Sequence, residues 1–319
     1  MKHYKFNMAR VGSAALFAAA FIWGTSFVMM KDVSEKFPPS LLLALRFTIA
    51  CAALALIFIK HMKKMDKSYL LPGLVIGTLL FSAYLIQTYG LIGTTPGKNA
   101  FLTASYCVIT PFLFWAVAKK RPDRYNILSA LICLAGILLI SVDFAGESLL
   151  YIGLGDILTL ICGFFYAAQI VAISVMTGDK DPVIVTVLQF GVAAVLSWIT
   201  FGVLSAFGLA PVSATSADFG SLAGQILYLA LMCTGAAILF QNFGQKYAHP
   251  ASAAVILTFE AVFGALFSLV LGREEGFTVW RALGFVLVFA AVVISETKLA
   301  FLRRKTAPLQ KESPESGRT

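Results

Sequence analysis

The chain has 319 residues, of which 59% are hydrophobic and 13% are charged, and its formal net charge is +9. Soluble domains carry about 25% charged residues, so this composition excludes an ordinary soluble protein. A basic charge balance can indicate nucleic-acid binding, but here the lysines and arginines cluster in short segments between apolar runs, as in membrane proteins. We therefore expect the lipid bilayer as a partner and no nucleic acid.

The residue types that most often carry catalysis or hold metals form no constellation. All five cysteines lie inside apolar runs without a Cys-x-x-Cys pair, and the three histidines lie in the N-terminal tail or in loops. Cysteines in such positions are typical of small core residues. The histidines fit neither a Ser-His-Asp set nor a His-Glu-x-x-His motif. We expect no metal, no cofactor and no catalytic residue, and so a protein that is not an enzyme.

Ten apolar runs follow one another along the chain, each about long enough as a helix to cross a hydrocarbon core of about 30 Å. A tail of residues 1–10 precedes the first run. The tail 305–319 is polar and contains two prolines, so we expect it to be disordered. The predicted helices cover residues 11–30, 39–59, 69–90, 97–118, 125–142, 151–176, 183–205, 221–244, 250–271 and 278–297.

Basic residues alternate in density between successive connections. With the N-terminus in the cytoplasm, the cytoplasmic segments hold 19 lysines and arginines, the outer segments hold five, and Arg46 lies within a run. The positive-inside rule then predicts a multi-pass protein of the plasma or inner membrane with both termini in the cytoplasm.

The sequence repeats itself. Residues 87–100 recur at 241–254, an offset of 154 that places Gln87 on Gln241. In both copies an apolar run ends in a glutamine and an aromatic-glycine pair, and a proline opens the next run. The first and sixth runs also match, at an offset of 143, with Trp23 on Tyr166.

The repeat defines two halves, residues 11–145 and 148–300, with five runs each. An odd number of spans forces the halves into opposite orientations across the membrane. The predicted fold is therefore an all-α integral membrane protein with ten transmembrane helices, arranged as two inverted five-helix repeats. Inverted repeats of this kind place a solute site near the midplane between the halves.

Several short motifs follow one another along residues 11–298. They are Trp23-Gly24, Arg46-Phe47, the corner from Gly90 to Pro96, Phe259-Glu260-Ala261-Val262-Phe263, and Leu271-Gly272-Arg273-Glu274-Glu275. Their order and spacing resemble the EamA group of the drug/metabolite transporter superfamily. The resemblance implies ten helices and the export of small metabolites, amino acids or drugs without ATP. Ala261 stands where the family pattern often has proline.

Two charged residues, Arg46 and Glu260, lie well inside the predicted spans. Glu260 lies about halfway along the ninth run, where insertion scales put the cost of a charged side chain at about 3 kcal/mol. It must be paired, protonated or facing water, either as a proton or cation site or as a structural partner. Arg46 has three open roles, which are pairing with Glu260, binding a substrate carboxylate, or extending to the outer headgroups.

Amide and aromatic side chains supply the other candidates. Tyr84 and Gln87 are three residues apart, as are Tyr166 and Gln169, so each pair shares a helix face. Amides in membrane bundles either hold helices together or line a cavity, and aromatic residues also mark the interfacial belts or fill the bundle. The predicted substrate-binding residues are Trp23, Arg46, Tyr84, Gln87, Tyr106, Tyr166, Gln169, Gln241 and Glu260.

The sequence thus predicts a secondary transporter that exports a small organic metabolite, amino acid or drug by alternating access through a midplane cavity. Proton coupling and the choice between monomer and homodimer stay open. One alternative is an uncoupled facilitator of the same solutes. Another is a membrane-embedded lipid-processing enzyme or scaffold, although a lipid enzyme should show a catalytic cluster near one interface.

Overall fold

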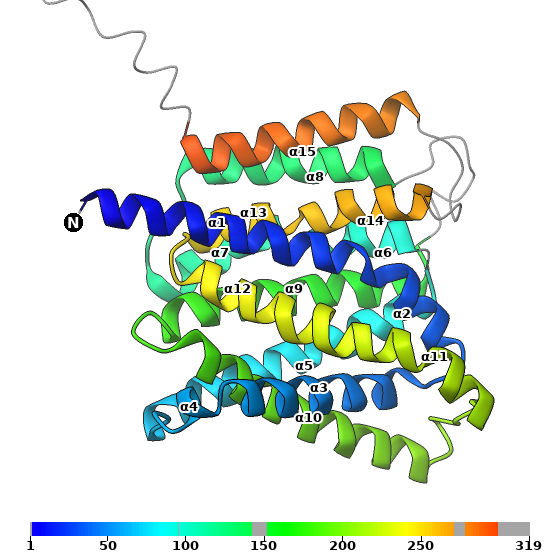
Figure 1. Cartoon of the computed structure of the whole chain (residues 1–319). Coiled ribbons are helices and arrows are strands. Elements are labelled where there is room, and N and C mark those ends of the chain that lie inside the picture. The colour runs from blue at the N-terminus through cyan, green and yellow to red at the C-terminus, as the bar shows by residue number, and fades with distance from the viewer. Residues whose placement is uncertain (1, 95, 142–151, 271–277, 299–319) are drawn as a thin grey trace, which may run out of the picture.

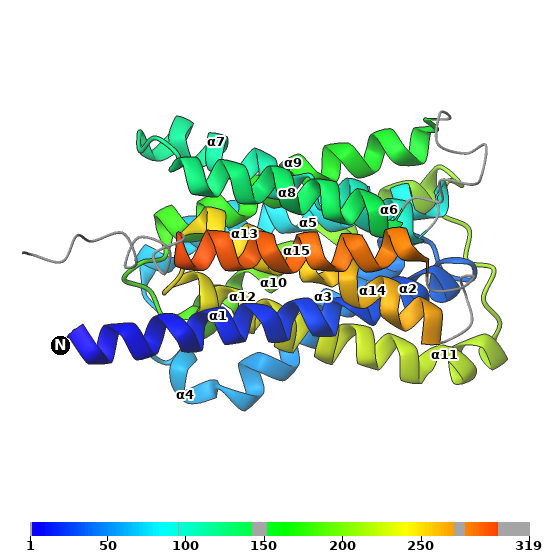
Figure 2. The same ribbon diagram turned by 90° about the horizontal axis from the view of Figure 1, so that it is seen from above.

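The computed structural model describes residues 2–94, 96–141, 152–270 and 278–298. Within these ranges the chain is helical, and the long helices lie side by side with their axes along one direction (Figures 1 and 2). The tail 305–319, for which we predicted disorder, lies outside the described residues.

The described residues of the first half form eight α-helices and one short 3₁₀ turn. In chain order these are α1 (Lys2–Gly24), α2 (Ser26–Ser34), α3 (Pro39–Ile57), α4 (Ile59–Met62), η1 (Lys67–Tyr69), α5 (Leu70–Ile92), α6 (Pro96–Thr103), α7 (Tyr106–Ala118) and α8 (Arg124–Ser141).

The second half begins after the undescribed residues 142–151 and contains a π-helical segment, η3. Its elements are α9 (Leu154–Met176), α10 (Pro182–Ala206), α11 (Ser216–Tyr228), η3 (Leu229–Ala236), α12 (Ala237–Gln245), α13 (Pro250–Leu257), α14 (Phe259–Val270) and α15 (Val279–Thr297).

Prolines begin several of these helices for a simple reason. The first turn of a helix does not use its N–H groups, and the fixed φ of proline already suits it. Pro182 opens α10 directly after Asp181, whose carboxylate accepts a hydrogen bond from the backbone N–H of Val183. Pro250 opens α13 after His249, which caps that helix through its ring nitrogen.

In the described part of the chain, seven helical stretches are long and apolar enough to cross a membrane. The first, fifth and tenth predicted spans correspond to shorter apolar helices, Met8–Gly24, Arg124–Leu139 and Val279–Ser295. The protein is therefore a multi-pass membrane protein. The seven longer stretches are Pro39–Ile57, Lys67–Ile92, Asn99–Ala118, Leu154–Met176, Pro182–Ala206, Ala217–Gln245 and Pro250–Phe267.

Three predicted spans are interrupted well inside their length, which corrects the expectation of continuous helices from the sequence. The span 11–30 breaks at Thr25, 97–118 breaks at residues 104–105, and 250–271 breaks at Thr258. At two breaks a threonine hydroxyl donates to a carbonyl three residues earlier, 2.7 Å from Thr25 and 2.6 Å from Thr258. Such bonds compete with the helical ladder. The break at Thr258 therefore forms although Ala261 is not proline.

Polar contacts join the two halves of the chain at both ends of the bundle. One end, called here the basic end, holds residues 58–69, 119–124, 177–181 and 246–249, and the start of α1 lies there too (Figure 1). His61 and Asp181 lie 2.7 Å apart at this end, and the ammonium of Lys246 donates to the backbone carbonyl of Lys180 at 2.8 Å. These contacts join α4 to the start of α10 and the end of α12.

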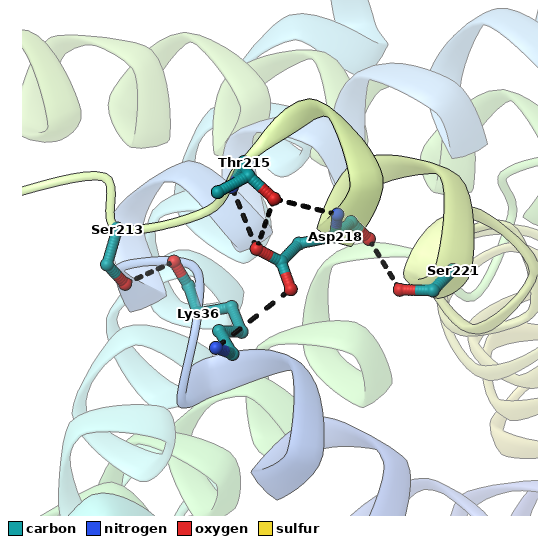
Figure 3. Close-up of polar contacts among 5 residues, drawn as sticks. All are labelled: Lys36, Ser213, Thr215, Asp218 and Ser221. Carbon is teal, nitrogen blue, oxygen red and sulfur yellow. Dashed lines mark hydrogen bonds and ion pairs between the residues drawn. The ribbon is translucent and has the colours of Figure 1, made fainter.

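The opposite end contains residues 35–38 and 207–215 (Figure 1). Figure 3 shows the polar contacts around Lys36 at this end. Lys36, just after α2, lies 3.9 Å from Asp218 in the first turn of α11, and Ser213 donates to the carbonyl of Lys36 at 3.1 Å. Asp218 also accepts from the hydroxyl and the backbone N–H of Thr215, which forms a capping box at the start of α11. The first and second halves of the chain thus contact each other at both ends.

Candidate functional site

A cavity of about 30 Å³ lies inside the bundle between these two ends. A water molecule needs about 10–15 Å³ by this measure, so the cavity has room for one or two waters. Both halves of the chain contribute side chains. The lining comprises Trp23, Ser26, Phe27, Met30, Arg46, Tyr84, Gln87, Tyr106, Tyr166, Ile170, Gln241, Leu257 and Glu260.

Eight of the nine residues predicted from the sequence lie in this lining, and Gln169 does not. Gln169 is fully buried behind the wall, where its side-chain oxygen accepts from Gln241 Nε2 at 3.0 Å. The prediction missed Ser26, Phe27, Met30, Ile170 and Leu257. Helical periodicity could have predicted two of them, because Ser26 and Met30 follow Trp23 by three and seven residues and so share its helix face.

Arg46 reaches the cavity from the middle of α3 and is 1% exposed. Its Nε donates to the hydroxyl of Thr234 at 3.1 Å, its NH1 contacts Met30 Sδ at 3.5 Å, and its guanidinium carbon lies 5.2 Å from the ring centre of Tyr84. Thr234 belongs to η3, and its own hydroxyl donates to the carbonyl of Leu229 at 2.9 Å. That bond fixes the hydroxyl hydrogen away from Arg46, so the oxygen lone pairs face the guanidinium.

Glu260 lies in the first turn of α14, two residues after the break at Thr258, and is 6% exposed. The hydroxyl of Tyr106 points to Glu260 Oε1 over 3.4 Å, which is long for an O–H···O hydrogen bond. Tyr106 itself opens α7 directly after the break at 104–105. The two breaks therefore deliver a tyrosine and a carboxylate to the same point of the cavity.

Gln87 is held in one orientation by neighbours from two other helices. Its side-chain oxygen accepts from the hydroxyl of Tyr166 at 2.7 Å, and its Nε2 donates to Thr103 Oγ1 at 3.2 Å. Both ends of the amide are thus satisfied, which is what a buried amide requires. Tyr166 also packs on Tyr84, with ring centres 5.8 Å apart, and on Tyr106, at 6.2 Å. Three tyrosines form a continuous aromatic wall.

The predicted pairing of Arg46 with Glu260, one of the alternatives left open above, is not formed. Both side chains are described, and no ion pair within 4.0 Å joins them. The cavity thus presents one guanidinium and one carboxyl group at separate places on a wall of aromatic, amide and aliphatic side chains. Among the described residues no group of three or more histidines, cysteines or carboxylates is close enough together to hold a metal ion.

Comparison with known families decides the class of this arrangement. The model of the EamA-like transporter family matches residues 10–142 and again residues 153–297. The chain belongs to the EamA-like transporter family. Its membership of the drug/metabolite transporter superfamily follows from this.

Curated relatives of this EamA protein are transporters by name. One from Archaeoglobus fulgidus, "Uncharacterized transporter", is 30% identical over 284 residues, which covers 86% of this chain and 83% of the relative. Another from Bacillus subtilis, "Uncharacterized transporter YyaM", is 24% identical over 279 residues, which covers 85% and 88%. The EamA protein described here is therefore a membrane transporter.

A solved structure named only "Crystal structure of protein" has the same fold as this EamA chain. It superimposes with a TM-score of 0.72 at 18% identity and covers 93% of this chain and 99% of the other. At this identity the likeness establishes the fold alone.

Proposed function

We propose that this EamA protein is a secondary transporter that exports a small organic solute by alternating access, with residues 11–145 and 148–300 acting as inverted repeats around the cavity. The observation that carries the proposal is the contact between Tyr106 and Glu260. These residues are 154 apart, and the same offset relates Gln87 to Gln241 in the sequence. Residues equivalent under a two-fold axis can touch each other only where they lie beside that axis.

Two further features support a two-fold axis through the cavity. The helix breaks at residue 104 and at Thr258 differ by the same 154 positions, so each repeat has a broken helix at the same place. Gln87 and Gln241 both line the cavity. Broken helices that meet near the midplane are typical of solute sites in transporters built from inverted repeats.

The small volume of the cavity supports a transport mechanism in which the two halves of the chain move relative to each other. Sites for organic ligands usually measure about 300–1,000 Å³, far more than the 30 Å³ found here. The cavity must therefore expand before a metabolite can enter. Polar contacts join the two halves of the chain at both ends of the bundle, and we infer that these contacts separate in turn when a solute passes. Rocking of one half against the other would open the ends in turn.

The wall favours a particular kind of solute. Arg46 supplies a fixed guanidinium, which suits a carboxylate or phosphate group. Glu260 supplies a separate acceptor, which suits an amine or another hydrogen-bond donor. The tyrosines supply flat apolar surface between them. We propose a solute with an acidic group at one side and a donor group at the other.

The membrane placement is part of the same proposal. The connections richest in lysine and arginine lie together at the basic end (Figure 1). The positive-inside rule then assigns this end to the cytoplasm and places both termini there, in the plasma or inner membrane. Coupling to protons through Glu260 would distinguish an active exporter from an uncoupled facilitator.

Reconstituted liposomes test the proposal. A thermal-shift panel of amino acids, organic acids and cationic drugs first identifies a stabilising solute, and counterflow of its radiolabelled form measures transport. We expect Gln241→Leu to slow counterflow and Phe240→Leu, an exposed neighbour on the outside of α12, to leave it unchanged. Equal counterflow by both variants, with a normal solute-induced shift, would remove the cavity as the site.

A further inference from the structure

A row of buried amides leads from the cavity toward the basic end along α12. Gln241 lines the cavity, and Asn242 and Gln245 are each 3% exposed. Gln245 follows Gln241 by four residues and Asn242 by three, so it is a neighbour of both on the helix surface. The helix ends at Gln245, and Lys246 at the basic end follows directly. The row therefore spans the distance between the cavity and that end.

Helices α9 and α10 contribute polar side chains that bond to this row on α12. Gln169 of α9 accepts from Gln241 at 3.0 Å, and Thr186 of α10 accepts from Asn242 Nδ2 at 2.8 Å. Gln189 lies one turn beyond Thr186 on the same face of α10 and is fully buried. We call these four amide side chains and one hydroxyl side chain the amide cluster; its members are Gln169, Thr186, Gln189, Asn242 and Gln245.

Much of the hydrogen-bonding capacity of the amide cluster is unused. Among the described residues no protein atom bonds either polar atom of Gln189 or of Gln245, nor Nε2 of Gln169 or Oδ1 of Asn242. Leaving a buried donor or acceptor unsatisfied costs about 1–3 kcal/mol. By contrast, both polar atoms of Gln87, the repeat equivalent of Gln241, have protein partners. A cluster with no task beyond packing would be more stable with apolar side chains.

We propose, on the basis of the transport function above, that the amide cluster lines the half of the solute path between the cavity and the basic end. When that end opens, the unused donors and acceptors hydrogen-bond to water and to polar groups of the passing solute. Amides carry no net charge, so they can accompany both an acidic group and a donor group without trapping either. A path must bind weakly enough to release what it carries.

Two contacts at the basic end join the elements that carry the amide cluster. Lys246, directly after Gln245, donates to the carbonyl of Lys180, and His61 contacts Asp181 just before the start of α10. These bonds tie the end of α12 and α4 to the start of α10. Under the proposal they separate when this end opens.

Cysteine accessibility in the full-length protein tests the proposal. Gln245→Cys and Gln189→Cys are compared with Ile238→Cys and Val187→Cys, buried apolar positions on the same two helices. Inside-out membrane vesicles are treated with a membrane-impermeant methanethiosulfonate, and the labelled peptides are quantified by mass spectrometry with the unaltered protein as background. We expect at least about tenfold faster labelling of the cluster positions, because the open state of a two-state protein reaches populations near 10% while rarer openings stay well below it.

Labelling of the cluster positions at the rate of their controls, in vesicles of either orientation, would overturn the proposal. Labelling of the cluster positions only from the side opposite to that of Lys64→Cys, a marker of the basic end, would also overturn it. The outcome is separable from the proposed function. If Gln241→Leu slows counterflow while Gln245→Cys labels no faster than Ile238→Cys, the cavity stands as the site and the path does not run through the amide cluster.

Discussion

Arg46 and Glu260 line the same cavity, but Arg46 is bound to Thr234 and lies over the ring of Tyr84 instead of pairing with Glu260. Within the described part of the chain, the side chain of Glu260 makes one long contact, with Tyr106. Both groups are therefore available to a ligand. Had the two formed a buried ion pair, they would have neutralised each other and left the cavity with no charged group to offer a solute.

This arrangement predicts the behaviour of Glu260→Gln. The substitution leaves no cation unpaired, so we expect normal yield and a melting temperature close to that of the unaltered protein. We also expect solute exchange across liposomes to continue while a pH gradient no longer drives it, because the variant cannot carry a proton. The measurements are the thermal melt and uptake with and without a pH gradient.

Two results would contradict that prediction. Breaking a buried ion pair costs about 3–5 kcal/mol, so a collapse in yield that Arg46→Gln rescues would show that the two residues pair in another state. A stable variant whose transport still follows the pH gradient would show that Glu260 does not carry the coupled proton.

Thr234 holds Arg46 in place from the π-helical segment. Thr234→Val keeps the shape of the side chain but removes the acceptor for Nε. Without this acceptor the guanidinium is no longer held in place and has to be ordered when the solute binds. The hydrogen bond contributes about 1.5–3 kcal/mol, which limits the expected fall in solute affinity to roughly 10- to 100-fold. Thr234→Ser should restore most of the affinity, whereas Thr110→Val, a buried threonine of α7, should have little effect. The dissociation constant of the solute for each variant is measured by isothermal titration. If Thr234→Val weakens solute binding no more than Thr110→Val does, Thr234 does not position Arg46 for the solute.

The carboxyl group of Asp181, at the basic end, should make the stability of the folded protein depend on pH. Burial disfavours its charged form, but hydrogen bonds from His61 and from the backbone N–H of Val183, with the charges of His61 and Lys246, outweigh burial and lower its pKa. A lowered pKa stabilises the folded state above the ordinary value of 3.8. That stabilisation is lost as the pH falls from 3.8 through the lowered pKa.

The variant Asp181→Asn isolates this effect, because asparagine still caps α10 but does not titrate. We expect it to melt below the unaltered protein at about pH 6, and the gap to close as the pH falls below 3.8. Melting curves in detergent between about pH 3 and pH 7 measure the gap, with Asp179→Asn, an exposed neighbour, as the control. A gap that stays constant over this range would show that the charge of Asp181 contributes nothing.

The topology is open to a direct test at exposed positions. Ser213 is exposed at the end opposite the basic end, and Lys64 is exposed in the connection after α4. We expect Ser213→Cys to label with an impermeant maleimide on intact cells and Lys64→Cys to label only after permeabilisation. Labelling of both positions on intact cells would contradict the assignment of the basic end to the cytoplasm.

The sequence by itself determined the class of the protein and most of its candidate site. Composition and apolar run length are local properties, and a bilayer imposes a length on every helix that crosses it, so the helices could be placed in order. The two copies of the repeat could be aligned because residues such as Gln87 and Gln241 keep the same neighbours in sequence. A charged group such as Glu260 could be singled out because its cost in a membrane is known without any knowledge of its partners.

Only the tertiary structure decided which of those residues face one another. The contact between Tyr106 and Glu260 depends on two helix breaks and on the packing of α14 against α6, the helix before α7, and no local pattern specifies either. The same holds for Arg46, whose partners Met30 and Thr234 lie 16 and 188 residues away, and for Gln169, which turned out to lie behind the wall. Side-chain contacts are set by the way helices approach, and that approach is a property of the whole bundle.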